Sequence, residues 1–153
     1  MKGFFGQYNV NLDPKGRIAL PARIRPRTES GASVELALTK GLDGCLAIFT
    51  DEEWTSFQNR LEELSFTNRD LRNFSRHFYS LACIVEPDRQ GRFLIPSNLL
   101  EEAGLEKEVL IIGANRWIEI WNPENYRKQM SQLGVSYEDV AERLLSRDRG
   151  QEG

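Results

Sequence analysis

Apolar and polar side chains alternate near the start of the chain, and the alternation leads into a turn. Tyr8, Val10 and Leu12 are separated by asparagines, which is the period-two pattern of a β-strand. Residues 13–16 then read Asp-Pro-Lys-Gly, which places Asp, Pro and Gly where a type I turn with a left-handed glycine needs them. Apolar residues recur over 17–20, so the pattern predicts a bulged β-hairpin formed by these two strands.

The same pattern returns in the second half of the chain. A strand, a turn, a strand and a short helix are predicted at 81–86, 88–91, 92–95 and 97–103. Asp88 stands 75 residues after Asp13, and both copies read D-x-x-G-R followed by alternating apolar residues and a proline. Repetition at a fixed offset indicates that one structural unit is built twice.

The repetition continues beyond the turns. Residues 45–54 match residues 117–126 at an offset of 72, and each segment is an apolar strand that runs into a helix start. Apolar residues at helical spacing and cap signals predict helices at 51–64, 69–80, 123–133 and 137–145. We interpret their apolar stripes as core or subunit contacts. The predicted organisation is a first repeat at 1–66, a linker helix at 67–80, and a second repeat with a C-terminal helix at 81–153.

Length and composition are those of an ordinary globular protein. The chain has 153 residues, of which 40% are hydrophobic and 28% charged, which suits one medium domain or two small ones. No apolar run approaches the roughly 20 residues needed to cross a membrane. The N-terminus also has no signal-peptide pattern. We therefore expect a cytoplasmic protein that has no membrane partner.

The residues typical of enzymatic sites do not form any recognisable motif. Cys45 and Cys83 follow no motif spacing, and we expect both to be small core residues. His77 is the only histidine and is expected to be a packed or half-exposed helix residue, which leaves no cluster for a structural metal. No nucleophile elbow, P-loop or dinucleotide-binding glycine pattern occurs. We expect a protein that is not an enzyme and takes no cofactor, metal or small-molecule substrate.

Charge is unevenly distributed along the chain. The net charge is -3, yet residues 1–28 hold six basic residues and one acidic residue, a local net charge of +5. The remaining residues therefore sum to -8. The basic end coincides with the first turn motif, and this asymmetry favours a polyanion as the partner. The alternative is a solvated face that happens to be basic.

The D-x-x-G-R motif has a structural and a functional interpretation. In the structural one, Asp bonds the backbone N–H groups of its own turn, Gly takes the left-handed position, and Arg folds back onto Asp. That interpretation explains two copies without any function, but it does not explain the basic surplus around the first copy. In the functional one, a two-stranded ribbon enters the major groove of DNA. Arginine then bonds phosphates or guanine while the aspartate orients its guanidinium group.

Three stretches of the chain resemble a known family. They read FFGQYNVNLDPKGRIALPARIR, VEPDRQGRFLIPSNLLEEAGL and VLIIGANRWIEIWNPENY, and the resemblance covers nearly the whole chain. With two D-x-x-x-R motifs in one chain of this length, the sequence is similar to the MraZ family, whose members carry two AbrB/SpoVT-type domains in tandem. One difference from the family is Pro26, which should cut short the helical run that follows Pro21.

The resemblance implies a fold and an activity. The fold would be α+β with a mainly β core, built from two swapped-hairpin or double-split β-barrel repeats with peripheral helices. The protein would be a sequence-specific DNA-binding transcriptional regulator of bacteria, associated with the nucleoid. It would assemble into a ring-shaped homo-oligomer and bind repeated promoter elements of the division and cell-wall gene cluster. The alternative is an oligomeric protein-interaction scaffold in which the hairpins serve subunit contacts and no DNA is bound.

The resemblance also assigns candidate DNA-contact residues. In the first turn these are Asp13, Lys15, Gly16 and Arg17; in the second turn they are Asp88, Arg89, Gly91 and Arg92; Lys2 and Arg23 are added from the basic segment. The second turn has Gln90 where the first has lysine, so we expect the second hairpin to contribute less to DNA binding.

Overall fold

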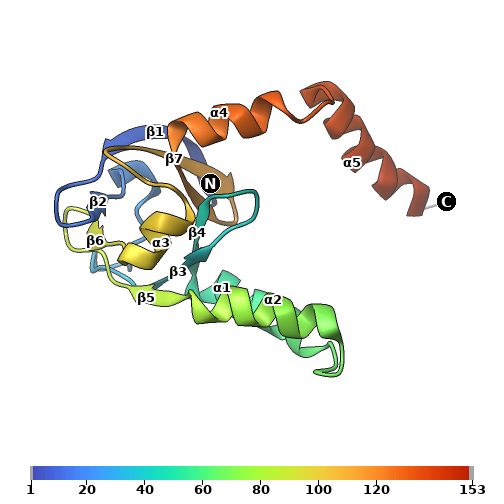
Figure 1. Ribbon diagram of the computed structural model, residues 1–153, viewed down its shortest axis with the longest axis horizontal. Helices are drawn as coiled ribbons and strands as arrows, with labels where there is room; N and C mark the ends of the chain where they lie inside the picture. Colours follow the sequence, from blue (N-terminus) through green and yellow to red (C-terminus); the bar gives the residue numbers. More distant parts are fainter. Residues whose placement is uncertain (1, 152–153) are drawn as a thin grey trace. The chain divides into compact units, whose positions relative to one another are not determined.

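The computed structural model describes residues 2–151, and the chain divides into two compact units, Met1–Pro123 and Glu124–Gly153. The first unit is built on an open antiparallel sheet (Figure 1). Its six strands, in sheet order, are β1 (Phe4–Asn11), β7 (Glu108–Asn115), β8 (Ile118–Trp121), β4 (Leu46–Thr50), β3 (Leu36–Lys40) and β5 (Cys83–Val85). A separate two-stranded sheet pairs β2 (Arg17–Ala19) with β6 (Arg92–Leu94).

The two predicted hairpins exist only as turns. Beyond each turn the flanking strands separate, because β1 pairs with β7 and β5 pairs with β3, while β2 pairs with β6 from the other repeat. The prediction that each repeat pairs its own two strands is therefore wrong. The physical reason is burial, since Ile18 of β2 and Phe93 of β6 are directly opposite each other and both point into the same core.

The exchange between repeats is closed by two equivalent hydrogen bonds. The backbone N–H of Leu20 donates to the Gly91 carbonyl at 2.8 Å, and the N–H of Ile95 donates to the Gly16 carbonyl at 2.9 Å. Each bond joins the turn glycine of one repeat to the residue that precedes the proline of the other. The β2–β6 sheet therefore has an approximate internal two-fold symmetry.

One hydrophobic core serves both repeats. Its fully buried side chains include Ile18, Leu38 and Ile48 from the first half of the chain and Leu99 and Ile111 from the second. The α+β class with a mainly β core is thus confirmed, and the six-stranded sheet keeps two edges, β1 and β5, so it does not close into a barrel. The repeat boundaries at 1–66 and 81–153 stay a prediction about the sequence, since the strands of both repeats are interleaved in one sheet.

The helices follow the predicted order. In the first unit they are η1 (Ala22–Ile24, a 3₁₀ turn), α1 (Asp51–Glu62), α2 (Arg69–Ser80) and α3 (Ser97–Glu102). The second unit holds α4 (Pro123–Ser131), apart from its first residue, Pro123, which belongs to the first unit. It also holds α5 (Tyr137–Gln151), which is longer than the predicted 137–145. Within residues 2–151, no helix is long and apolar enough to cross a membrane.

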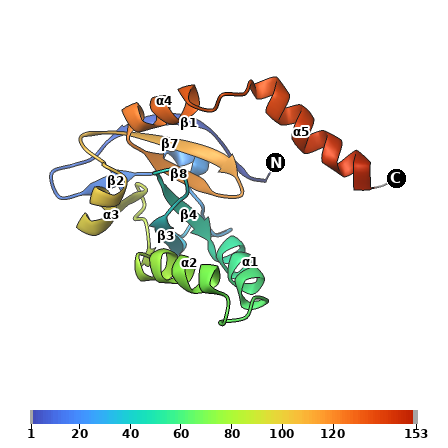
Figure 2. The ribbon, with the colours of Figure 1, turned by 45° about the vertical axis from the view of Figure 1, so that its right-hand side comes forward.

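Helices α1 and α2 run side by side next to β3 and β4 (Figure 2). Thr50 and Asn68 cap their N-termini, because the side chain of each accepts one hydrogen bond from the backbone N–H three residues later, as the capping signals require. Their contact is aromatic: Phe78 stacks on Trp54 and on Phe74, with ring centroids 5.3 and 5.0 Å apart. The predicted apolar stripes therefore pack between the helices, although Phe78 is the only buried residue of the pair.

Candidate nucleic-acid interface

The first turn is organised by one carboxylate. Asp13 Oδ1 accepts hydrogen bonds from the backbone N–H groups of Lys15 and Arg17, each at 2.9 Å. Its Oδ2 accepts from Arg17 Nε at 2.8 Å, and the backbone N–H of Asp13 donates to the Arg17 carbonyl at 2.9 Å. Gly16 takes the left-handed conformation with φ 86°, which only glycine adopts without strain. The motif therefore fixes both the turn and the direction of the Arg17 side chain.

The second turn repeats this geometry bond for bond. Asp88 Oδ1 accepts from the N–H groups of Gln90 and Arg92 at 2.9 Å, and Oδ2 accepts from Arg92 Nε at 3.0 Å. Gly91 is left-handed with φ 79°. Geometry alone thus gives no reason to rank the second turn below the first.

These hydrogen bonds lower the pKa of both aspartates from the ordinary value of 3.8. In each case the largest cause is the backbone N–H of the motif arginine, and the arginine side chain adds to it. A lowered pKa means that the folded turn favours the ionised carboxylate. The bonds therefore stabilise the turns above the unfolded pKa, and the stabilisation is lost as pH falls through the lowered value.

The outer face of the β2–β6 sheet carries both motif arginines. Arg17 pairs with Leu94 and Ala19 pairs with Arg92, and these four side chains alternate with the buried Ile18–Phe93 pair. The two arginines are therefore diagonal neighbours on one face, with Cα atoms roughly 7–8 Å apart. Their side chains are 42% and 50% exposed. In each arginine side chain, only Nε forms a hydrogen bond to a described residue, so the two terminal nitrogens, Nη1 and Nη2, remain available to a ligand.

The two turns differ in the side chain that contacts each of them from the other repeat. The segment after β2 brings Arg25 under the second turn, where Nε and Nη2 donate to the Leu20 carbonyl at 3.1 and 2.8 Å and Nη1 donates to the Arg89 carbonyl at 2.9 Å. The residue 75 positions later is Leu100, whose side chain lies under Gly16. Arg25 is thus a structural bond between the repeats, a role that the sequence did not reveal.

The other basic residues fall in three places. Lys15 is exposed at the tip of the first turn, and Arg23 is exposed on η1. Lys2 precedes β1, whereas the first turn follows it, so eight strand residues, roughly 26 Å, separate Lys2 from that turn. Lys2 is therefore not brought together with the other candidates.

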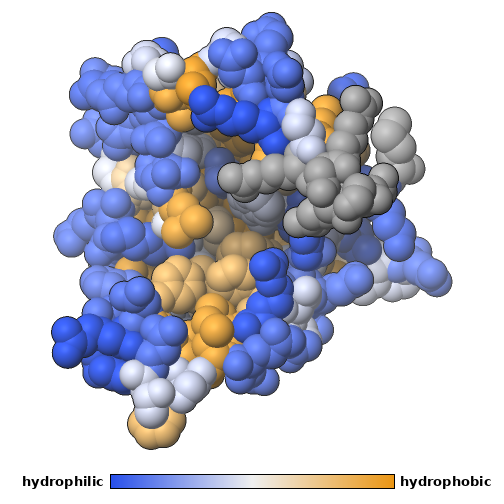
Figure 3. Space-filling model, turned by 90° about the vertical axis from the view of Figure 1, so that its right-hand side faces the viewer, coloured by the Kyte–Doolittle hydropathy of each residue, from blue (hydrophilic) through white to orange (hydrophobic). Residues whose placement is uncertain are grey.

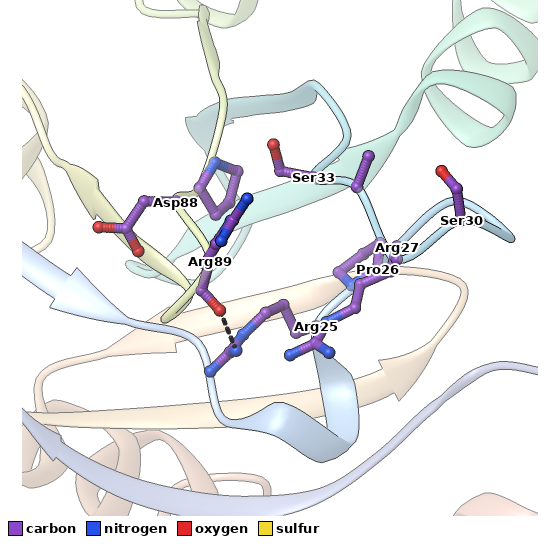
Figure 4. Close-up of a pocket in the computed structure, with 10 residues that line it drawn as sticks. Arg25, Pro26, Arg27, Ser30, Ser33, Asp88 and Arg89 are labelled. Atoms are coloured by element: carbon purple, nitrogen blue, oxygen red, sulfur yellow. Dashed lines mark hydrogen bonds between the residues drawn. The ribbon is translucent and has the colours of Figure 1, made fainter.

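Charge that is grouped in the sequence is redistributed in space. Arg25 and Arg27 line a hollow of about 520 Å³ together with Asp88 and Arg89 of the second turn (Figure 4). Arg25 and Arg27 of the basic segment therefore raise the positive charge around the second turn, whereas Lys15 and Arg17 stay at the first. This weakens the reasoning that made the second hairpin the lesser contact.

The described residues offer little else for chemistry. No group of three or more His, Cys, Asp or Glu side chains among them is placed to hold a metal ion. Burial raises the pKa of the Cys45 thiol to about 12, so the thiol stays protonated and unreactive at neutral pH. Cys83 is half-buried, and His77, expected to be packed or half-exposed, is exposed on α2.

Comparison with known proteins gives the family. The model of the family described as MraZ protein matches the chain twice, at residues 4–77 and 78–148. The chain belongs to the MraZ family. A protein named "Transcriptional regulator MraZ" from Heliobacterium modesticaldum is 47% identical over 145 residues, which cover 95% of this chain and 99% of the relative. One of the same name from Pelotomaculum thermopropionicum is 43% identical over 147 residues, which cover 96% and 99%.

The predicted family resemblance is thereby confirmed, with its tandem arrangement. The names of these MraZ relatives denote transcriptional regulators and not enzymes, in agreement with the expectation from the sequence. The boundary between the two family matches, at residues 77 and 78, falls near the end of α2.

The two turn glycines should differ in their tolerance of a side chain. At Gly16 an added Cβ would have its nearest neighbour at 3.5 Å, so Gly16→Ala should cost mainly the left-handed strain, about 1–2 kcal/mol. At Gly91 the Cβ would lie 2.5 Å from the Leu20 carbonyl and 2.8 Å from Arg25 Cζ, which should add about 1–3 kcal/mol. Urea unfolding at one protein concentration measures both, and equal midpoints for the two variants would contradict the difference.

The lowered aspartate pKa gives a second expectation. By ¹³C NMR, the Asp13 carboxyl should titrate below 3.8 in the wild-type protein. In Arg17→Ala the pKa should rise only part of the way, because the backbone N–H of residue 17, the largest cause, is kept in alanine. A full return to the ordinary value would show that the arginine side chain, not the backbone, holds the carboxylate.

Proposed function

We propose that this chain is a sequence-specific DNA-binding transcriptional regulator, and that the β2–β6 sheet is its contact surface. The observation that carries the proposal is the outer face of this sheet, where Arg17 and Arg92 point the same way, each oriented by its own aspartate. A two-stranded ribbon of this kind fits the major groove of B-form DNA. The names of the relatives support the same activity.

The chemistry of the two pairs suits recognition of a base or a phosphate. An arginine held at Nε by a carboxylate keeps Nη1 and Nη2 in a fixed plane, and this planar fork matches guanine O6 and N7 or two phosphate oxygens. Because the bound carboxylate already fixes the guanidinium, less side-chain entropy is lost on binding. Lys15 at the tip of the first turn and Arg89 at the tip of the second add exposed positive charge.

Self-association forms a further part of the proposal. One subunit offers few phosphate contacts, so strong binding to DNA calls for several subunits acting on repeated sites. We propose a ring-shaped homo-oligomer on promoter repeats of the division and cell-wall gene cluster, in the cytoplasm and with the nucleoid. An exposed apolar groove of about 290 Å³ supports self-association; it includes Leu42, Phe57, Phe74 and Trp117. Hydrophobic side chains are visible on this side of the molecule, edged by hydrophilic ones (Figure 3).

The first test removes each arginine in turn. Arg17→Ala and Arg92→Ala should each lower the affinity for promoter DNA by at least about tenfold per contact, because a charge-assisted bond to a base or phosphate is worth about 1.5–3 kcal/mol. Gel-shift titration measures the loss, and light scattering should find the oligomer unchanged. Arg76→Gln, an exposed arginine of α2, is the control for charge.

This test also separates the alternative function. If the turns serve subunit contacts in a scaffold, Arg17→Ala breaks the oligomer and the wild-type chain retains no DNA. Undiminished DNA binding by both arginine variants would overturn the assignment of the β2–β6 face.

Salt dependence gives an independent test. Contacts to phosphates release counterions, so the logarithm of the affinity should fall linearly with the logarithm of the salt concentration, by about 0.9 per phosphate contact. Fluorescence anisotropy with a labelled promoter fragment measures the slope. An affinity that stays constant between low and moderate salt would contradict ionic contacts to the DNA backbone.

A further inference from the structure

A hollow beside the second turn concentrates positive charge that no ion pair among the described side chains neutralises. It has a volume of about 520 Å³ and lies between the segment 25–33 and the turn at 87–89 (Figure 4). Three arginines, Arg25, Arg27 and Arg89, contribute to its lining, against the single acidic side chain of Asp88. Among the residues whose side chains are described, none of the three arginines has a carboxylate oxygen within ion-pair distance.

Asp88 is not available to balance this charge. Its Oδ1 already accepts two backbone N–H groups of its own turn, and its Oδ2 accepts Arg92 Nε. Burial and then the positive charge of Arg27 lower the pKa of Arg25, and only the weaker field of Asp88 acts in the opposite direction. Arg27 therefore lies close enough to Arg25 to disfavour the charged form of Arg25, and an anion between the walls would relieve this repulsion.

Backbone and side-chain interactions hold the two walls of the hollow in place. Arg25 is fixed by its three hydrogen bonds to the Leu20 and Arg89 carbonyls, and the latter bond is drawn in Figure 4. The opposite wall is a short loop whose ends, Arg27 and Ser33, form an isolated antiparallel β-bridge. Ser30 and Ser33 also line the hollow; Ser33 Oγ donates to Glu86 Oε1 at 3.4 Å, and Ser30 Oγ shares a hydrogen bond with Thr28 Oγ1 at 3.0 Å. Guanidinium groups around a pocket are the chemistry that recognises phosphate.

We propose that this hollow binds a phosphate group, with Arg27 and Arg89 as its ionic contacts and Arg25 as the residue that positions the Arg89 backbone. The volume has room for a phosphate and the group to which it is attached. Two sources have this chemistry: a backbone phosphate of DNA lying on the adjacent second turn, or a free phosphorylated small molecule. The first source rests on the proposed DNA-binding function, whereas the second is independent of it.

The experiment compares Arg27→Gln with Arg76→Gln, which removes the same charge from an exposed position on α2. The Arg27 side chain donates no hydrogen bond within the described residues, and the β-bridge to Ser33 involves only its backbone, so Arg27→Gln should leave folding unchanged, which a thermal melt checks. Each protein is titrated with DNA fragments of several unrelated sequences over a range of salt, and separately with inorganic pyrophosphate by calorimetry. The wild-type chain and Arg17→Ala are measured alongside.

If the phosphate belongs to DNA, Arg27→Gln lowers the affinity about tenfold for every sequence and makes the salt slope shallower by about 1 for each subunit bound. If it belongs to a small molecule, Arg27→Gln lowers pyrophosphate affinity about tenfold and leaves DNA affinity unchanged. Arg76→Gln changes neither quantity. The proposal is overturned if Arg27→Gln behaves like Arg76→Gln in both titrations, or if the wild-type chain binds neither probe.

Failure of this proposal can be told apart from failure of the DNA-binding function. A wild-type chain that binds no DNA overturns the function, and the pyrophosphate titration then still decides the hollow. A chain that binds DNA through Arg17, with Arg27→Gln indistinguishable from the control, keeps the function and removes the phosphate site.

Discussion

The architecture depends on the exchange of strands between repeats in the β2–β6 sheet. Two reciprocal backbone hydrogen bonds, Leu20 to Gly91 and Ile95 to Gly16, hold each turn against the other repeat. The pairing buries Ile18 opposite Phe93 and leaves the alternate positions facing out. A single pairing therefore joins the repeats, completes the core and puts two arginines on one surface. Neither repeat could bury its own turn-flanking strand in the same way alone, since the partner strand comes from the other.

Local features of this fold could be predicted from the sequence because their causes are local. The turn at Asp13 follows from a carboxylate within reach of two N–H groups and a glycine at the left-handed position. Helix α2 begins and ends where predicted, at Arg69 and Ser80, and its start follows from Asn68, which caps the N-terminus. Strand pairing could not be predicted in this way. The residues of β2 and β6 are chemically alike, so pairing within a repeat and pairing between repeats satisfy the same alternation.

The same limit applies to the candidate site. The sequence placed both Asp–Arg pairs correctly, since each pair is four residues apart within one turn. It counted Arg25 as free charge near the first turn, because a contact with Arg89, 64 residues away, leaves no trace in spacing. The one visible signal is that the aligned position in the second repeat holds Leu100, an apolar residue where the first repeat has a charge. A departure from internal symmetry thus marked the residue whose role differs.

The approximate two-fold symmetry of the β2–β6 sheet explains why two similar motifs serve one surface. Because the pair is antiparallel, this symmetry relates Arg17 to Arg92, and both lie on the same outer face of the sheet. The supports under the turns break that symmetry, with Arg25 under one and Leu100 under the other. The protein therefore combines two arginines held in equivalent geometry with unequal surrounding charge. This inequality gives the β2–β6 face a polarity that a perfectly symmetric ribbon would lack, so on the proposed DNA site the two ends of the face would not be interchangeable.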